Sequence, residues 1–129
     1  MRRALTAALA AVALAVAGCG AGPSDQEKVH QTLDDFGKAT AAKDYQALCD
    51  HVLAPKLIEK LKQVGLPCEI ALQQSLGDVK DPRITIGKIT ISDNLAKAEV
   101  RTSASGQQPS QDTVELVPVD DTWRISSLG

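Results

Sequence analysis

Ile84-Thr85-Ile86-Gly87-Lys88-Ile89-Thr90-Ile91 is the stretch of sequence that decides the fold. Its β-branched residues favour a strand, and its apolar residues recur with a period of two. The parity changes in the middle, because the first two isoleucines share one face and the last two fall on the other. One extra residue at Gly87-Lys88 would form a β-bulge, which returns all four isoleucines to one side and bends the strand. We therefore predict a curved sheet.

Three more strands are predicted after this stretch. Leu95 to Thr102 alternates apolar and charged residues, so one face packs on the core and the other meets water. Ser103 to Gln111 is polar and predicts an exposed loop, and Pro118 confines its end of the third strand, Thr113 to Val119, to an edge or bulge. The last strand begins at Trp123. The expected core positions of the sheet are Ile84, Ile86, Ile89, Ile91, Ala96, Ala98, Val100, Val114, Leu116, Trp123 and Ile125.

Helical patterns precede the strands. Ser24 and Glu27 form a capping box, and an apolar stripe at helical spacing follows it, made of Val29, Leu33, Phe36 and Thr40. Asp44 caps a short second helix that runs through Val52. Pro55 starts a third helix that ends before Gly65, and a fourth spans Cys68 to Leu76.

The third helix is amphipathic. Leu57, Ile58, Leu61 and Val64 are expected to point inward, while Lys56, Glu59, Lys60 and Lys62 point outward. A solvated face is the favoured interpretation of the three lysines, and contact with anionic lipid headgroups is the alternative. In the fourth helix, Ile70 and Leu72 are expected to supply the apolar side chains.

Helices followed by an antiparallel meander predict an α+β fold, in which the N-terminal helices pack on a curved four-strand sheet. The segment Lys43-Asp44-Tyr45-Gln46-Ala47-Leu48-Cys49 and the closing Thr122-Trp123-Arg124-Ile125 resemble the NTF2-like (SnoaL-like) cone fold. The chain is similar in particular to small exported lipoproteins of high-GC Gram-positive bacteria that carry this fold with a cysteine pair. The resemblance implies an NTF2-like domain over residues 24–129.

The N-terminus predicts export and a lipid anchor. Arg2 and Arg3 precede an apolar run, and Leu14-Ala15-Val16-Ala17-Gly18-Cys19 resembles a lipobox. We therefore expect a lipoprotein signal peptide over residues 1–18, a lipidated tether over residues 19–23, and a membrane-anchored protein on the extracytoplasmic face. A secretory signal cut at Ala15-Val16-Ala17 is the alternative.

Two further cysteines, Cys49 and Cys68, form an even pair, which in an exported domain predicts a disulfide. A metal site would need additional His or Cys ligands, and His51 is the one such residue close in sequence. We therefore expect no metal and no cofactor.

Composition argues against nucleic-acid binding. The chain has 14 basic and 16 acidic residues, and loss of Arg2 and Arg3 with the signal peptide would bring the formal net charge to about −4. Phe36, Tyr45 and Trp123 are the three aromatic residues, which are too few for a base-stacking platform.

The inward positions of the strands lack the acids, histidines or tyrosines that proton transfer requires. His30, Asp34, Tyr45 and His51 are the helix-side candidates, and no Ser-His-Asp, Cys-His, phosphate-loop or metal-spacing motif occurs. An isomerase- or dehydratase-type enzyme is therefore the least favoured class, and we assign no catalytic residue.

The core is mostly aliphatic, with small alanines in the second strand, and such a core predicts a residual apolar cavity. We predict a non-enzymatic module that binds a small hydrophobic or amphipathic ligand. The predicted ligand-binding residues are Val29, Leu33, Phe36, Ile86, Ile89 and Ala98. A protein-interaction module of the cell envelope is the alternative.

Overall fold

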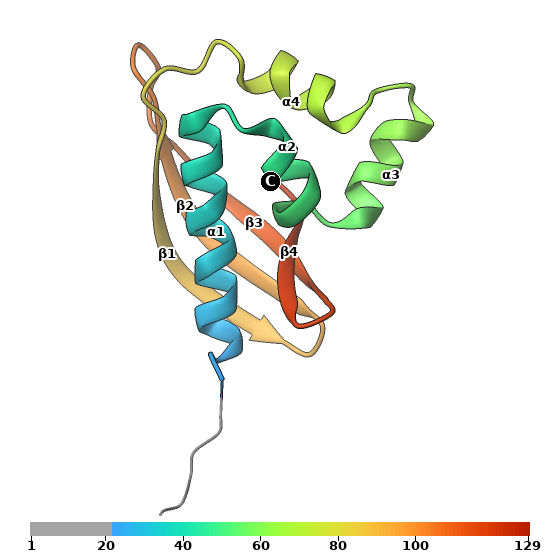
Figure 1. Cartoon of the computed structure of the whole chain (residues 1–129). Helices are drawn as coiled ribbons and strands as arrows, with labels where there is room; N and C mark the ends of the chain where they lie inside the picture. Colours follow the sequence, from blue (N-terminus) through green and yellow to red (C-terminus); the bar gives the residue numbers. More distant parts are fainter. Residues whose placement is uncertain (1–21) are drawn as a thin grey trace, which may run out of the picture.

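The structure is a computed structural model that describes residues 22–129. The predicted signal peptide and the predicted lipidation site, Cys19, lie outside these residues. Helices come first and strands follow, which confirms the predicted α+β order (Figure 1). The helical segments are α1 (Asp25–Ala42), α2 (Tyr45–Ala47), the π-helical turn η1 (Leu48–Val52), α3 (Pro55–Gln63) and α4 (Cys68–Leu76). The strands are β1 (Arg83–Ser92), β2 (Leu95–Ser103), β3 (Ser110–Val119) and β4 (Thr122–Ser127).

The four strands form one antiparallel sheet in the order β1-β2-β3-β4. The sheet curves, and α1 crosses its concave face (Figure 1). The curvature has the predicted cause: Ile86 pairs with Val100, but the next pair joins Ile89 to Ala98, so β1 carries one extra residue. A Cβ at Gly87 would lie 3.1 Å from the carbonyl oxygen of Glu99, which explains why a glycine occupies the bulge.

The third strand is longer than predicted. β3 begins at Ser110 rather than Thr113, because Ser110 pairs with Thr102 and the two hydroxyl oxygens lie 2.9 Å apart. The connecting loop is shorter than predicted, because β2 ends at Ser103 and β3 begins at Ser110. The pairing of β2 with β3 ends at Leu116. Pro118 lies beyond this point, so β2 has no carbonyl that would require a hydrogen bond from the N–H that proline lacks.

The first helix follows the predicted pattern. The Ser24 hydroxyl accepts a hydrogen bond from the Glu27 N–H at 3.2 Å, and the Ser24 N–H donates to the Glu27 carboxylate at 3.1 Å. Val29 and Leu33 are fully buried, and Phe36 packs half-buried against the core. The capping box therefore fixes the start of a helix whose apolar stripe faces the sheet.

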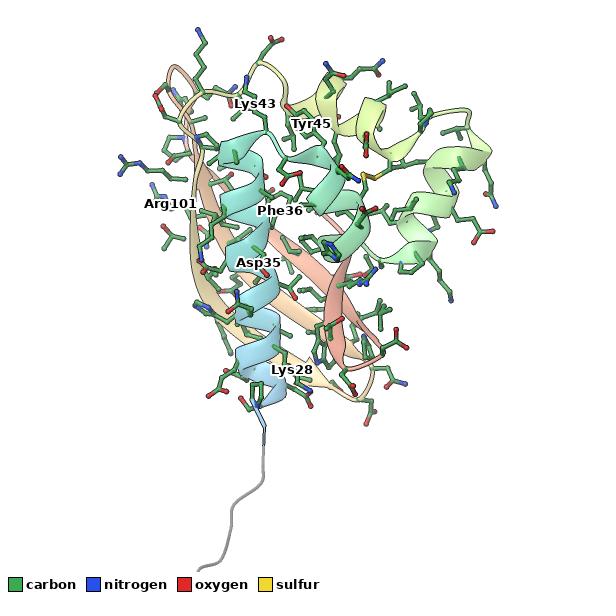
Figure 2. All side chains as sticks on the ribbon, viewed as in Figure 1. Lys28, Asp35, Phe36, Lys43, Tyr45 and Arg101 are labelled. Carbon is green, nitrogen blue, oxygen red and sulfur yellow. A yellow bond between two sulfur atoms is a disulfide. The ribbon has the colours of Figure 1, made fainter. Side chains whose placement is uncertain are left out.

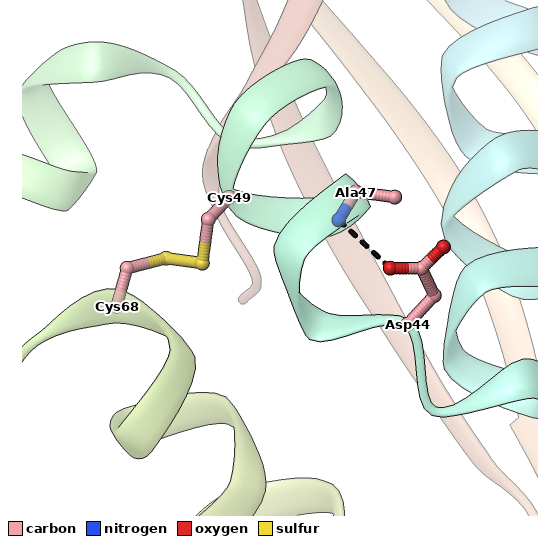
Figure 3. The surroundings of a disulfide bond; sticks show 4 residues. All are labelled: Asp44, Ala47, Cys49 and Cys68. Atoms are coloured by element: carbon pink, nitrogen blue, oxygen red, sulfur yellow. Dashed lines mark hydrogen bonds between the residues drawn. A yellow bond between two sulfur atoms is a disulfide. The ribbon is translucent and has the colours of Figure 1, made fainter.

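The second predicted helix is divided. Asp44 caps α2 as expected, accepting from the Ala47 N–H at 3.1 Å (Figure 3). The chain then widens into the η1 turn, in which the Leu53 N–H donates to the Leu48 carbonyl at 2.9 Å. Leu53 leaves this turn beside β4, and the Ala54 N–H donates to the Ile125 carbonyl at 2.7 Å. The divided helix thus brings the chain against the sheet edge.

The prediction for the inner face of α3 is confirmed only in part. No residue of α3 is buried: Leu57 and Ile58 are half-buried against the core, and Val64 is 70% exposed. Ile70 of α4 is also exposed, at 46%. The physical reason is that α3 rests against α4 and the edge strand β4 instead of crossing the sheet.

The predicted disulfide is present and joins η1 to α4 through Cys49 and Cys68 (Figure 3). All the predicted core positions of β2, β3 and β4 are buried, and the four isoleucines of β1 pack half-buried at its edge. The largest fully buried side chains are Leu33, Leu48, Leu53, Leu116, Ile125 and Val29.

Candidate functional site

A hollow of about 230 Å³ lies where the C-terminal half of α1 meets the end of α4 and the start of β1. We call it the end cavity. Its apolar wall consists of Phe36, Leu76, Val79, Pro82 and Ile84. These side chains come from α1, α4, β1 and the connection between α4 and β1, so the end cavity is a product of the tertiary fold.

Gly37 controls how closely α1 approaches β1 at this wall. A Cβ at Gly37 would lie 2.6 Å from Cγ2 of Ile84, a distance that carbon atoms do not tolerate. The glycine therefore lets the helix pass directly over the first strand. Both residues line the end cavity, so this close approach shapes its floor.

The rim of the end cavity is polar. Thr102 and Ser110 contribute hydroxyl groups 2.9 Å apart, and the Ser110 hydroxyl also donates to Asp112 at 3.0 Å. Gln107 and Gln108 of the β2–β3 loop add amide groups. An apolar wall with uncharged hydrogen-bonding groups at the rim suits an amphipathic molecule.

Arg83 alone is charged among the residues that line the end cavity. It precedes Ile84, which packs toward the core, and side chains alternate along a strand. The Arg83 side chain therefore leaves β1 on the face opposite to Ile84, and the apolar wall of the cavity carries no charge.

The four titratable candidates do not converge. Asp34 forms an exposed ion pair with Lys38 at 3.0 Å, and the hydrogen bond and charge of Asp34 raise the pKa of Lys38. Tyr45 lies on α2, away from Phe36 on α1, and its buried hydroxyl has no hydrogen-bond partner among the described residues (Figure 2). His30 and His51 are exposed, and none of the four candidates lines the end cavity.

Within residues 22–129 no cluster of three or more His, Cys, Asp or Glu side chains has the arrangement of a metal site. In the same part of the chain, every helix is too short or too polar to cross a bilayer.

Solved structures share this architecture. The crystal structure of the Kfla4162 protein from Kribbella flavida matches 79% of this chain and 86% of its own, with a TM-score of 0.56 and 18% identity. The de novo designed NTF2 fold protein NT-9 matches 83% of this chain and 87% of its own, with a TM-score of 0.54 and 16% identity. The chain has the NTF2-like fold. At these identities the similarity concerns the fold alone, since function resides in individual sites.

No protein-family model matches the sequence, and no curated protein matches it either. The function of this NTF2-like domain must therefore be argued from its own residues.

The six predicted ligand-binding residues do not surround one hollow of the NTF2-like domain. Val29, Leu33 and Ala98 have no exposed surface and pack inside the core. Phe36 lines the end cavity, while Ile89 borders a shallow depression beside His30. A role for any of the six in ligand binding stays a prediction.

Sequence reasoning missed most of the end cavity. Leu76, Val79 and Pro82 lie in or beside the connection between the last helix and the first strand, where no periodic pattern marks an inward face. One signal was present: Val79 is a large aliphatic residue within an otherwise polar connection.

Proposed function

We propose that this NTF2-like domain is an extracytoplasmic binding module, anchored to the membrane through Cys19, that holds a small amphipathic ligand in the end cavity. The observation that carries the binding function is the end cavity itself, with its aliphatic and aromatic wall and neutral polar rim. Apolar hollows with a few convergent polar groups are the usual sites of small ligands.

The volume of the end cavity limits the size of the ligand. At about 230 Å³ it exceeds the roughly 150 Å³ of a protein cavity that accepts benzene. It is smaller than the roughly 300–1,000 Å³ of pockets for drug-sized ligands. The end cavity can therefore hold a single ring or one short chain with a polar end. A complete two-chain lipid is too large for it.

The lining sets the orientation of such a ligand. Its apolar part would contact Phe36, Leu76 and Ile84, where burial of carbon contributes about 25 cal/mol per Å² removed from water. Its polar end would face the amides of Gln107 and Gln108. A hydroxyl or amide group on the ligand can form hydrogen bonds with these amides.

Ligand binding is tested by thermal unfolding of the full chain with a panel of short-chain alcohols and monocyclic phenols. A ligand at about 100 times its Kd stabilises the native state by about 2.7 kcal/mol. For a domain of this size we expect the midpoint to rise by about 10 °C or more. Ala104→Phe, which fills the cavity from its lining, should abolish the rise.

Ala42→Phe is the matched control, because Ala42 is exposed and lies outside the end cavity. It should leave the ligand-induced rise unchanged. If no member of the panel raises the midpoint, the ligand-binding proposal fails and the protein-interaction alternative becomes the better one.

The anchor proposal has a separate basis, the lipobox-like segment that ends at Cys19. In a bacterial cell that processes lipoproteins, we expect the full chain to fractionate with membranes. Cys19→Ala should release it or stall it as the uncleaved precursor, because the sulfur that carries the lipid is gone. Membrane fractionation together with mass spectrometry of the mature N-terminus measures both effects. Recovery of the unmutated protein in the soluble fraction, without lipid mass, would overturn the anchor.

A further inference from the structure

The α3 helix carries an apolar face that the domain covers at its start and leaves exposed at its end. This α3 face consists of Leu57, Ile58, Leu61 and Val64. Its exposure increases along the helix, from the half-buried Leu57 to Val64, which is 70% exposed. Ile70, at the start of α4, is another of the most exposed large apolar residues. Leu57 and Ile58 contact the core, so the exposed Val64 and Ile70 are the apolar residues that suggest a partner outside the domain.

Lysines border the α3 face. At about 100° per residue, Lys60 and Lys62 fall on opposite sides of the apolar arc, and Lys56 lies beyond Lys60. None of the three forms an ion pair within residues 22–129. Long lysine side chains that flank an apolar stripe can keep their charges in a polar layer while the stripe enters an apolar one.

The lysines of α3 contrast with a group of acidic residues elsewhere in the domain. Carboxylates gather at the opposite end, where α1 begins and two strand turns lie side by side (Figure 1). They belong to Asp25, Glu27, Asp93, Asp120 and Asp121. The domain thus carries carboxylates near the start of α1, and three lysines with one glutamate, Glu59, along α3.

From these features we propose that the α3 face binds the surface of an anionic lipid bilayer. An apolar stripe, a lysine-rich border and modest overall hydrophobicity are the properties of helices that lie in the membrane interface. Anionic lipids supply the opposite charge, with about 1 kcal/mol for each lysine near the surface.

A second copy of the chain fits this face less well. A two-fold contact through α3 would bring the same residues of both copies together, lysines against lysines. The bilayer offers the complementary charge instead.

The α3 helix is also fixed in its folded form before it contacts the bilayer. α4 follows α3 through Gly65 and Pro67, and the disulfide joins its first residue, Cys68, to the core at η1. The bilayer would meet a helix that is already folded, so binding avoids most of the cost of ordering a chain segment. This inference does not depend on a ligand in the end cavity.

The test places a tryptophan in the α3 face of the full chain. Val64→Trp is mixed with vesicles whose acyl chains carry bromine, made either of phosphatidylcholine alone or of equal parts phosphatidylcholine and phosphatidylglycerol. We expect bromine to quench the introduced tryptophan in the mixed vesicles and far less in the neutral ones. Trp123 is buried, so the unmodified chain gives the background signal.

Adding Lys60→Gln and Lys62→Gln should weaken this contact roughly thirtyfold. The matched control is Lys88→Gln with Lys97→Gln, which removes the same charge from exposed positions of the sheet and should leave the quenching unchanged. Salt should reduce the quenching, because it screens charges at a surface.

Equal quenching in the two kinds of vesicle, or an equal loss in both lysine pairs, would overturn the proposal. So would a blue shift of the introduced tryptophan that grows with protein concentration without vesicles, because that result would identify a second copy as the occupant.

Discussion

Loss of the Cys49–Cys68 disulfide is expected to lower the free energy of unfolding by about 3 kcal/mol. The bridge spans 19 residues, and on the chain-entropy estimate closing a loop of this size stabilises the fold by about 3 kcal/mol. That is a large share of the roughly 5–15 kcal/mol that small domains have in total. Urea unfolding of the full chain, compared with Cys49→Ala/Cys68→Ala, measures the difference.

The reduced form of the unmutated chain is the control for this variant. If the cross-link itself is the source of stability, reduction and the double substitution should destabilise by similar amounts. A double variant within about 0.5 kcal/mol of the oxidised protein would contradict the prediction, since measured disulfide effects typically lie at about 2–4 kcal/mol.

The structure also indicates which part of the domain should lose stability first when the disulfide is removed. Between Cys49 and Cys68 lies α3, which buries no residue, and α4 buries only Cys68 and Leu72. Few apolar contacts therefore hold this part of the domain without the bridge, and such segments open at low free-energy cost. Amide hydrogen exchange in the reduced protein should increase over residues 55–76 before it increases in the sheet.

Features that depend on residues near one another in sequence could be predicted. The capping box of Ser24 and Glu27 needs two side chains one turn apart, and the structure confirms it. The bulge at Gly87 follows from the parity change among four isoleucines in one strand. The alternation of apolar and charged residues in β2 predicted that Ala96, Ala98 and Val100 lie in the core, because helices cover one face of the strand and water the other.

Features that depend on where the elements meet could not be predicted. The amphipathic pattern of α3 indicates which face is apolar, but it does not say whether another element covers that face. The η1 turn arises because Leu53 and Ala54 must reach the edge strand β4 at Ile125, a contact between distant parts of the chain.

The end cavity has the same origin. Phe36, Leu76 and Ile84 are far apart in sequence and come together only at the end of the sheet. Val29, Leu33 and Ala98 were also expected to line a pocket, but these three residues are fully buried in the core. The small alanines of β2 line no part of the end cavity, so composition did not indicate where it lies.

Trp123 links the two layers of the domain through both its side chain and its backbone. Its ring is buried, with 4% of its surface exposed, and its indole N–H donates to the Asp25 carboxylate at 3.1 Å. Its carbonyl accepts a hydrogen bond from the buried Thr32 hydroxyl. The side chain and the backbone of one residue thus fasten β4 to the first turns of α1.

Trp123→Ala is therefore expected to destabilise the domain by about 3–5 kcal/mol, because removing a buried indole loses its burial and leaves a cavity. Trp123→Phe keeps most of the packing but loses the bond to Asp25, so we expect a cost of about 1–2 kcal/mol. Asp25→Ala removes the same bond from the exposed side and should cost about 1 kcal/mol. Trp123 is the only tryptophan, so unfolding of all variants must be followed by circular dichroism. If Trp123→Ala cost no more than Asp25→Ala, the indole would contribute only its hydrogen bond, and its assignment to the core would be wrong.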